Sequence, residues 1–291
     1  MTFQWWPAPA KLNLFLHVTG RRPDGYHDLQ TAFQLLDLCD EVGLAASGDG
    51  AIERLAGPAG VPAEADLTVR AARTLKPYCK GHFGVKIQLR KRIPAGAGLG
   101  GGSSDAATVL VVLNRLWGAG LAPGQLADLG ATLGSDVPVF VLGDSAWAEG
   151  RGERLKSIIL PDRWFLVIYP GVAVSTAELF QAPELTRNSP VITIRALFEG
   201  ATRNDFEPIV RARQPAVAAA IDWLSAYAPA RLTGTGSCVY AAFEQAAQAE
   251  RIAARVPDEW HCFVARGVNR SPLHAALEAA GGSLRHGPRD A

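Results

Sequence analysis

Residues 94–104 are the part of this chain that most restricts its fold and function. They contain five glycines, preceded by a stretch with strand-like alternation and followed by a stretch with helical spacing. Glycine tolerates positive φ and lets the backbone approach a ligand, and the free N–H groups of a helix N-terminus attract anions. This order predicts a phosphate-binding loop. The alternative is a flexible connector in which Ser103 or Ser104 caps the helix.

The glycine spacing fits neither of two common nucleotide-binding loops. A Walker loop has a Lys directly after its last glycine, and here Ser103 stands in that place. Gly96, Gly98 and Gly101 match the dinucleotide fingerprint. That kind of site also needs an acidic residue about 20 positions later, and residues 106–127 contain none. A nucleotide is therefore expected to bind here in a third way.

Hydrophobic periodicity predicts secondary structure on both sides of the loop. Residues 8–19 alternate in polarity, which predicts a half-buried strand with Lys11 and Asn13 on one face. Turn residues ending at Gly25 lead into an apolar stretch and indicate a β-hairpin. Further patterns predict helices over residues 67–75 and beyond Ser103, and strands over residues 83–89 and 164–169.

The mixture of strands and helices predicts an α+β fold. A change of pattern near residues 160–162 places a domain boundary there, which divides the chain into residues 1–162 and 163–291. The Gly/Arg/Pro-rich tail from Gly281 is expected to be a frayed end.

Composition argues against several classes of function. With 29 basic and 28 acidic residues, the formal charge is +1, so binding to nucleic acid is not expected. No apolar stretch approaches the roughly 20 residues of a membrane span, and no secretion signal is seen. The four cysteines are widely spaced, so neither a cysteine zinc site nor a redox motif is expected. The six histidines are scattered, so a histidine metal site is not expected. We predict a cytoplasmic protein.

Three motifs in order give the chain a resemblance to the GHMP kinase superfamily. Residues 94–104 resemble its phosphate-binding signature, residues 9–14 its first motif, and residues 232–238 its third, a C-terminal glycine loop. The resemblance implies a two-domain fold. Its N-terminal domain would be of the kind found in ribosomal proteins, its C-terminal domain would be ferredoxin-like, and the active site would lie in the cleft between them.

Three further segments resemble one subfamily, the 4-diphosphocytidyl-2-C-methyl-D-erythritol kinases. They are residues 25–31, 134–138 and 183–188. The resemblance implies transfer of the γ-phosphoryl of ATP, with Mg²⁺, to the 2-hydroxyl of a cytidine-diphosphate alcohol in the non-mevalonate isoprenoid pathway. Two alternatives stay open: another GHMP kinase that acts on homoserine, mevalonate or a sugar, and a catalytically silent binding module of the same fold.

The resemblance assigns catalytic roles to Asp136 and Lys11. Phosphoryl transfer needs a group that orients the attacking hydroxyl and accepts its proton, and Asp136 is expected to do this. By its position alone, Asp136 would favour the role of a helix N-cap. Lys11 would stabilise the Asp136 carboxylate and the developing charge, although alternation alone would favour a solvated Lys.

The resemblance also assigns the binding residues. Asn13 would contact the substrate, and Tyr26, His27 and Phe180 would hold the cytosine, whereas the simpler interpretation is a packed Tyr and an exposed His. The expected ATP-binding residues are Pro94, Ala95, Gly96, Ala97, Gly98, Leu99, Gly100, Gly101, Gly102, Ser103 and Ser104.

Two carboxylates depart from the pattern of the relatives. Asp105 and Asp66 stand where many relatives carry Asn. The charge of Asp105 would oppose nearby phosphates unless it points away from them or helps to hold Mg²⁺. The sequence assigns no metal ligands, and it leaves both a monomer and a homodimer open.

Overall fold

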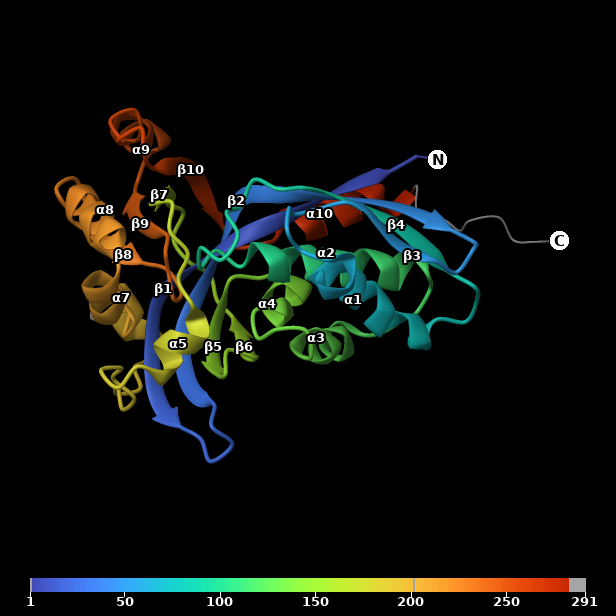
Figure 1. The fold of residues 1–291 in the computed structure, drawn as a ribbon, viewed down its shortest axis with the longest axis horizontal. Coiled ribbons are helices and arrows are strands. Elements are labelled where there is room, and N and C mark those ends of the chain that lie inside the picture. The colour runs from blue at the N-terminus through green and yellow to red at the C-terminus, as the bar shows by residue number, and fades with distance from the viewer. Residues whose placement is uncertain (1, 201, 283–291) are drawn as a thin grey trace.

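The computed structural model describes residues 2–200 and 202–282. The chain opens with a long antiparallel hairpin of β1, Gln4–Arg21, and β2, His27–Ser47, which pair from Gln4 with Leu44 to Arg21 with His27. The turn between them has Gly25 at φ +86°. This confirms the predicted hairpin, whose closed end projects from the body of the molecule (Figure 1).

The prediction that the first strand is half-buried is wrong. Leu12 lies on one face of β1 and is fully buried, and on the other face Lys11 and Asn13 are 3% and 4% exposed. Helix α2, Gly101–Leu116, lies near one side of β1, while Leu12 packs into a cluster with Phe165 and Val167 of a later strand. Both faces of β1 are therefore covered by protein, which a pattern within the strand cannot reveal.

The N-terminal half packs helices on a sheet built around β2. β2 pairs with β1, β4 and β5, while β3 pairs in parallel with β4, and β6 pairs with β5. Apolar residues of α1, α2 and α4 fill the core against this sheet. The remaining bounds are β3 Ile52–Ala56, α1 Leu67–Leu75, β4 Gly84–Arg90, α3 Pro123–Ala131, α4 Val137–Leu142, β5 Ala146–Gly150 and β6 Arg154–Ser157, with 3₁₀ turns at Ala63–Ala65 and Lys76–Tyr78.

The C-terminal half has antiparallel strands in the order β10-β7-β9-β8. Helices α7, α8 and α9 lie together at this end of the molecule (Figure 1). The bounds are β7 Trp164–Tyr169, α5 Thr176–Gln181, α6 Ile194–Phe198, α7 Glu207–Arg213, α8 Pro215–Ser225, β8 Ala230–Leu232, β9 Val239–Phe243, α9 Ala246–Ala253, β10 His261–Val268 and α10 Pro272–Ala279. The α+β prediction is confirmed.

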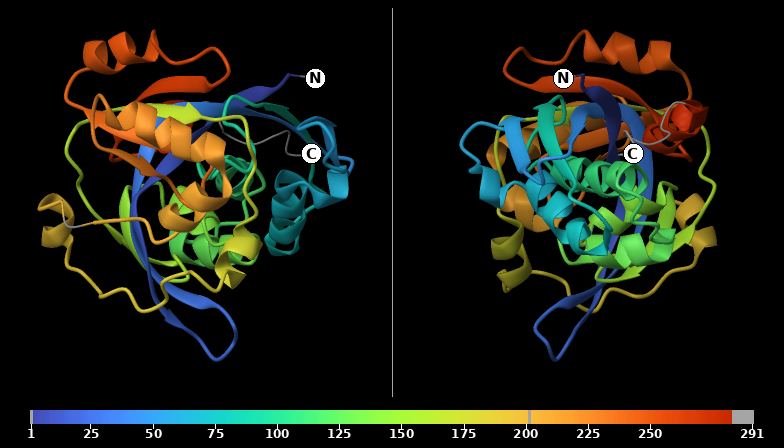
Figure 2. Two further views of the ribbon diagram at one scale, coloured as in Figure 1. Left: turned by 60° about the vertical axis from the view of Figure 1, so that its left-hand side comes forward. Right: turned by 90° about the vertical axis from the view of Figure 1, so that its right-hand side faces the viewer.

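Several contacts cross between the halves. β10 pairs with β2 through Gly267 and Val268, so one sheet runs through both halves. Leu273 and Leu277 of α10 pack in the N-terminal core. The segment between α5 and α7 runs past the hairpin (Figure 2), where the Ser189 N–H donates to the Val18 carbonyl at 3.0 Å. The boundary after residue 162 stays a prediction.

Local predictions agree well with the elements observed. The predicted helix over 67–75 is α1, the predicted strand over 164–169 is β7, and the predicted strand over 83–89 is β4, shifted by one residue. The four cysteines are free thiols. Within residues 2–200 and 202–282, no helix has the length and apolar character needed to cross a membrane. The last helical turn is Ala280–Gly282, so most of the predicted frayed tail lies outside the described residues.

Candidate active site

A cleft of about 1160 Å³ runs along the glycine-rich loop and has room for more than one small ligand. Most of the predicted site residues line it. They are Lys11, Asn13, Tyr26, His27, Pro94, Ala95, Gly96, Ala97, Gly98, Gly100, Gly101, Gly102, Ser103, Asp136 and Phe180. Leu99 and Ser104 are outside the lining, because Leu99 packs in an apolar cluster and Ser104 is buried within α2.

The glycine loop takes a backbone conformation that needs glycine. Gly96, Gly98 and Gly100 have φ values of +65°, +79° and +73°, in the left-handed region. Gly100 is the N-cap of α2, and the helix begins at Gly101. The alternative in which Ser103 or Ser104 caps the helix is therefore wrong. The free N–H groups of the first turn of α2 lie at the cleft, where they can bind an anion.

The C-terminal glycine loop, residues 232–238, packs directly on the phosphate-binding loop, residues 94–104. The Cys238 N–H donates to the Ala97 carbonyl at 3.1 Å. A Cβ on Gly98 would lie 2.3 Å from the Thr233 carbonyl oxygen, so only a glycine permits this approach. The Thr233 hydroxyl also accepts a 2.9 Å bond from the Asn13 N–H. All three sequence motifs therefore meet at one point.

Lys11 and Asp136 form a pair at the edge of the cleft. The Lys11 Nζ lies 3.3 Å from the Asp136 Oδ2, and it also donates to the Asn13 Oδ1 at 2.6 Å and to the Gly98 carbonyl at 2.9 Å. Lys11 is buried, whereas the Asp136 side chain is 31% exposed. A fixed cation therefore faces a carboxylate that a ligand can reach.

Asp136 occupies the N-cap position of α4 but does not cap it. Its φ and ψ of −86° and −12° are helical, and its side chain makes no capping hydrogen bond. A carboxylate that caps a helix accepts hydrogen bonds from backbone N–H groups. Here the carboxylate stays available to accept a proton from a ligand.

Asn13 is held by its neighbours on β1 and β2. Its Nδ2 donates to the Thr31 hydroxyl at 2.9 Å, and the Thr31 hydroxyl donates to the Phe15 carbonyl. Because the Asn13 Oδ1 accepts from Lys11, the orientation of the amide is determined by this chain of bonds.

At the other end of the cleft, His27 stacks on Phe180. Their ring centroids are 5.1 Å apart with an interplanar angle of 26°. Tyr26 is 56% exposed, and the Arg151 guanidinium lies 4.7 Å from its ring centroid. The structure thus joins His27 to Phe180 directly, and Tyr26 also lines the cleft.

The surroundings of His27 favour the neutral form of its ring. Burial lowers the pKa of His27, and the positive charges of Arg187 and Arg21 lower it further. The prediction of an exposed His, offered as the simpler interpretation, does not hold, because the side chain is buried. A neutral imidazole has one donor and one acceptor and can read the edge of a base.

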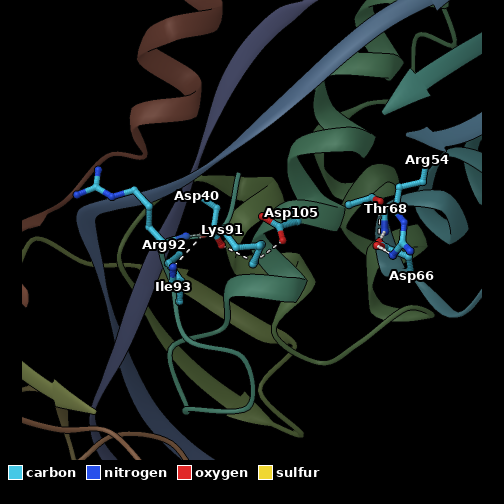
Figure 3. Close-up of polar contacts among 8 residues, drawn as sticks. All are labelled: Asp40, Arg54, Asp66, Thr68, Lys91, Arg92, Ile93 and Asp105. Atoms are coloured by element: carbon cyan, nitrogen blue, oxygen red, sulfur yellow. Dashed lines mark hydrogen bonds and ion pairs between the residues drawn. The ribbon is translucent and has the colours of Figure 1, made fainter. Parts of the chain in front are cut away.

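Asp40, Lys91 and Asp105 form a charged cluster next to the glycine loop, in which both carboxylates are buried (Figure 3). Lys91 and Asp105 also line the cleft. The Lys91 Nζ lies 2.5 Å from the Asp40 Oδ2 and 2.6 Å from the Asp105 Oδ2. The Asp40 Oδ1 also accepts from the N–H groups of Arg92 and Ile93, at 2.5 and 2.9 Å. Asp40 therefore anchors the segment that enters the loop, and Asp105 is turned toward Lys91.

Asp66 is the N-cap of α1. Its Oδ1 accepts from the Thr68 N–H at 2.8 Å and from the Thr68 hydroxyl at 2.7 Å. Its Oδ2 pairs with Arg54 at 2.6 Å (Figure 3). The negative charge of this carboxylate at the cleft wall is thus balanced by Arg54.

The free energy of unfolding is expected to fall as the pH rises from roughly 4 to 7 because of Asp105. Burial raises the pKa of Asp105 to about 7, and Lys91 opposes this rise. In that window the folded chain keeps a proton that the unfolded chain has released, so the slope contributed by Asp105 is at most about 1.4 kcal/mol per pH unit.

Urea unfolding at several pH values would measure this dependence. Asp105→Asn should flatten the curve, whereas Asp128→Asn, a change at an exposed position, should leave it as in the wild type. An Asp105→Asn curve as steep as that of the wild type would contradict the assignment.

The sequence assigned no role to some residues that shape the site. Asp40, Arg187 and Asn204 contact the predicted site segments, and Asn204 donates to the carbonyls of Leu232 and Gly234 at 3.0 and 2.8 Å. Arg187 lies in the segment 183–188, which gave a resemblance but no role. Among the described residues, no group of three or more His, Cys, Asp or Glu side chains is arranged to hold a metal ion.

Comparison with known proteins identifies both halves. The family model of the GHMP kinases N terminal domain matches residues 66–144, and that of the GHMP kinases C terminal domain matches residues 182–262. The chain is 57% identical over 284 residues to the 4-diphosphocytidyl-2-C-methyl-D-erythritol kinase of Alkalilimnicola ehrlichii, a match that covers 97% of this chain and 98% of the relative. It is 56% identical over 278 residues to the kinase of that name from Halorhodospira halophila, with 94% and 96% covered.

Solved structures of kinases also resemble this chain in fold. A crystal structure of 4-(cytidine 5'-diphospho)-2C-methyl-D-erythritol kinase superposes with a TM-score of 0.79 at 34% identity, covering 91% of this chain and all of the other. The mevalonate kinase of Methanococcus jannaschii has a TM-score of 0.66 at 17% identity, covering 92% of this chain and 99% of the other. The second similarity is one of fold alone.

Proposed function

This chain belongs to the 4-diphosphocytidyl-2-C-methyl-D-erythritol kinase family of the GHMP kinases, and we propose that it transfers the γ-phosphoryl of ATP to the 2-hydroxyl of that cytidine substrate. This reaction belongs to the non-mevalonate pathway to isoprenoid precursors. The observation that carries the proposal is the 3.3 Å pair of Lys11 and Asp136, which lies in one cleft with the glycine loop and His27.

In the proposed reaction, Asp136 orients the substrate hydroxyl and accepts its proton as the oxygen attacks the γ-phosphorus. A new O–P bond forms, the bond from the γ-phosphorus to the bridging oxygen breaks, and ADP leaves with that electron pair. Lys11 stabilises the charge that develops at the transferred group, and Asn13 positions the hydroxyl. The backbone N–H groups at the start of α2 bind the phosphates of ATP.

Mg²⁺ fits this cleft as an ion held mainly by the phosphates of ATP, because Mg²⁺ commonly binds through one or two carboxylates plus phosphate oxygens. The described residues offer no protein cage of three or more acidic, His or Cys ligands. When bound, the ion would neutralise charge on the phosphates.

The location and assembly of the chain are parts of the same proposal. We place it in the cytoplasm as a monomer or homodimer with a small-molecule substrate and no nucleic-acid partner. The near-neutral charge supports the last point.

The first test is release of ADP from MgATP in the presence of 4-diphosphocytidyl-2-C-methyl-D-erythritol, with homoserine, mevalonate and galactose as competing acceptors. Turnover with the cytidine substrate alone supports the proposal. Turnover with another acceptor would keep the fold and remove the cytosine roles, and the absence of any turnover would favour a silent binding module.

His27→Ala is expected to raise the KM for the cytidine substrate about 10- to 100-fold while leaving the KM for ATP within about threefold. The change removes the ring that stacks on Phe180 and the hydrogen bond that this ring is proposed to make to the base. Steady-state kinetics with each substrate varied would measure it, and His82→Ala, at an exposed histidine, serves as the control. An unchanged KM for the cytidine substrate would remove His27 from the base site.

A further inference from the structure

Arg187 connects the two residues that are proposed to hold the base. Its Nε donates to the His27 Nε2 at 3.1 Å, and its Nη2 donates to the Phe180 carbonyl at 2.9 Å. It also donates to the carbonyls of Ala182 and Leu185, at 2.8 and 3.1 Å. One guanidinium therefore determines where the His27 ring and the end of α5 lie relative to each other.

The partners of Arg187 are all neutral acceptors. Within residues 2–200 and 202–282, no carboxylate forms an ion pair with its guanidinium. Its charge therefore acts on the neighbouring imidazole, where it disfavours a second positive charge. This agrees with the lowered pKa of His27.

The contact between Arg187 and His27 determines the tautomer of the ring. A guanidinium has only donors, so the His27 Nε2 must accept with its lone pair. In a neutral imidazole the proton then resides on Nδ1. The Nδ1 atom has no hydrogen-bond partner among the described residues, and His27 lines the cleft. An N–H donor is thus available to a ligand beside Phe180.

We propose that Arg187 is a positioning residue that holds His27 as its Nδ1–H tautomer, and that this N–H donates to N3 of the cytosine and excludes uracil. The proposal rests on the proposed function, because it assumes a cytidine substrate. N3 of cytosine is an acceptor, whereas N3 of uracil carries a proton. Uracil would therefore place two donors against each other, which leaves a buried polar group unpaired.

The bond to the Phe180 carbonyl adds a second constraint. Because Phe180 stacks on His27 at 5.1 Å, the guanidinium supports both an aromatic face and the hydrogen-bonding edge beside it. Loss of Arg187 should therefore affect recognition of the base, while Lys11 and Asp136, which it does not contact, keep their geometry.

The tautomer can be measured without any substrate. In the full-length wild-type protein at neutral pH, ¹⁵N chemical shifts of the His27 ring should show a protonated Nδ1 and an unprotonated Nε2. Arg187→Met should increase the share of the Nε2–H tautomer. A wild-type ring with its proton on Nε2 would overturn the proposal, and this result does not depend on whether the proposed reaction occurs.

Base selection is measured by comparing kcat/KM for 4-diphosphocytidyl-2-C-methyl-D-erythritol with that for its uridine counterpart. The wild type should favour the cytidine compound by about 100-fold or more, and Arg187→Met should reduce this ratio by roughly 10-fold. The matched control is Arg213→Gln, which removes an exposed arginine that pairs with Glu184 of the same segment at 2.9 Å and should leave the ratio unchanged.

The outcomes separate the two proposals. If Arg187→Met lowers kcat/KM for both compounds equally, or if the wild type does not discriminate, the role of Arg187 in base selection is overturned. If the wild type phosphorylates neither compound, the proposed function fails and the cytosine contact fails with it, while the NMR spectrum still decides the tautomer.

Discussion

Asp136→Asn is expected to lower kcat for phosphoryl transfer by about 10²- to 10⁴-fold, the range that a general base contributes. Asparagine keeps the size of the side chain but cannot accept the proton of the attacking hydroxyl. Lys11 keeps its bonds to Asn13 and to the Gly98 carbonyl in this variant, so the cleft should keep its shape.

This loss should be confined to the chemical step. The Kd for ATP, measured by calorimetry, should stay within about threefold of the wild-type value, because Asp136 is proposed to face the acceptor and not the nucleotide. Asp258→Asn, at an exposed position outside the cleft, is the control. An Asp136→Asn enzyme with wild-type kcat would remove Asp136 from the role of base.

Gly98→Ala should weaken ATP binding at least about 10-fold and also lower the free energy of unfolding by about 2 kcal/mol or more. Two penalties combine at this position. The residue has a φ of +79°, and a Cβ would lie 2.3 Å from the Thr233 carbonyl oxygen. Because both atoms belong to backbone segments, the glycine loop and the third motif would have to separate.

A matched glycine that has a positive φ but no close neighbour separates the effect of backbone strain from that of the close approach to Thr233. Gly118 has a φ of +63°, a Cβ there would meet nothing within 4 Å, and it lies outside the cleft. Gly118→Ala should therefore lower stability by about 1 kcal/mol, through backbone strain alone, and leave ATP binding unchanged. Urea unfolding and calorimetry on both variants measure the difference. Equal effects of the two changes would show that the close approach to Thr233 does not matter.

Local patterns predicted the elements of this fold well. The hairpin, α1, β4 and β7 each follow from periodicity and turn residues that lie within the element itself. The start of α2 was predicted less well, because a serine next to a helix is a common N-cap. The glycine at position 100 caps the helix instead, with a positive φ that places the first turn at the cleft.

The candidate site was predicted mainly through the resemblance to GHMP kinases. On local patterns alone, Lys11 would be solvated and Asp136 would be an N-cap, and both residues are found instead in a 3.3 Å pair. Their roles in catalysis stay predictions. Asp40 was missed because a single Asp on a strand is typical of an ordinary surface position. Arg187 lies in the segment 183–188 that supported the resemblance, but its role depends on contacts with His27 and Phe180 that the segment does not encode.

The sequence by itself determined the hairpin, α1, β4 and β7, because each depends on residues that are close together in the chain. Its short motifs also indicated the kinase family, while the phosphate-binding role of residues 94–104 stays a prediction. Only the tertiary structure decided that Lys11 is buried, that Asp105 is turned toward Lys91, and that the His27 Nε2 accepts from Arg187. His27 and Arg187 are 160 positions apart in the sequence, and Lys11 and Gly98 are 87 positions apart. Burial, charge pairing and tautomer depend on such distant neighbours, and no periodicity within one element encodes which neighbour the fold will supply.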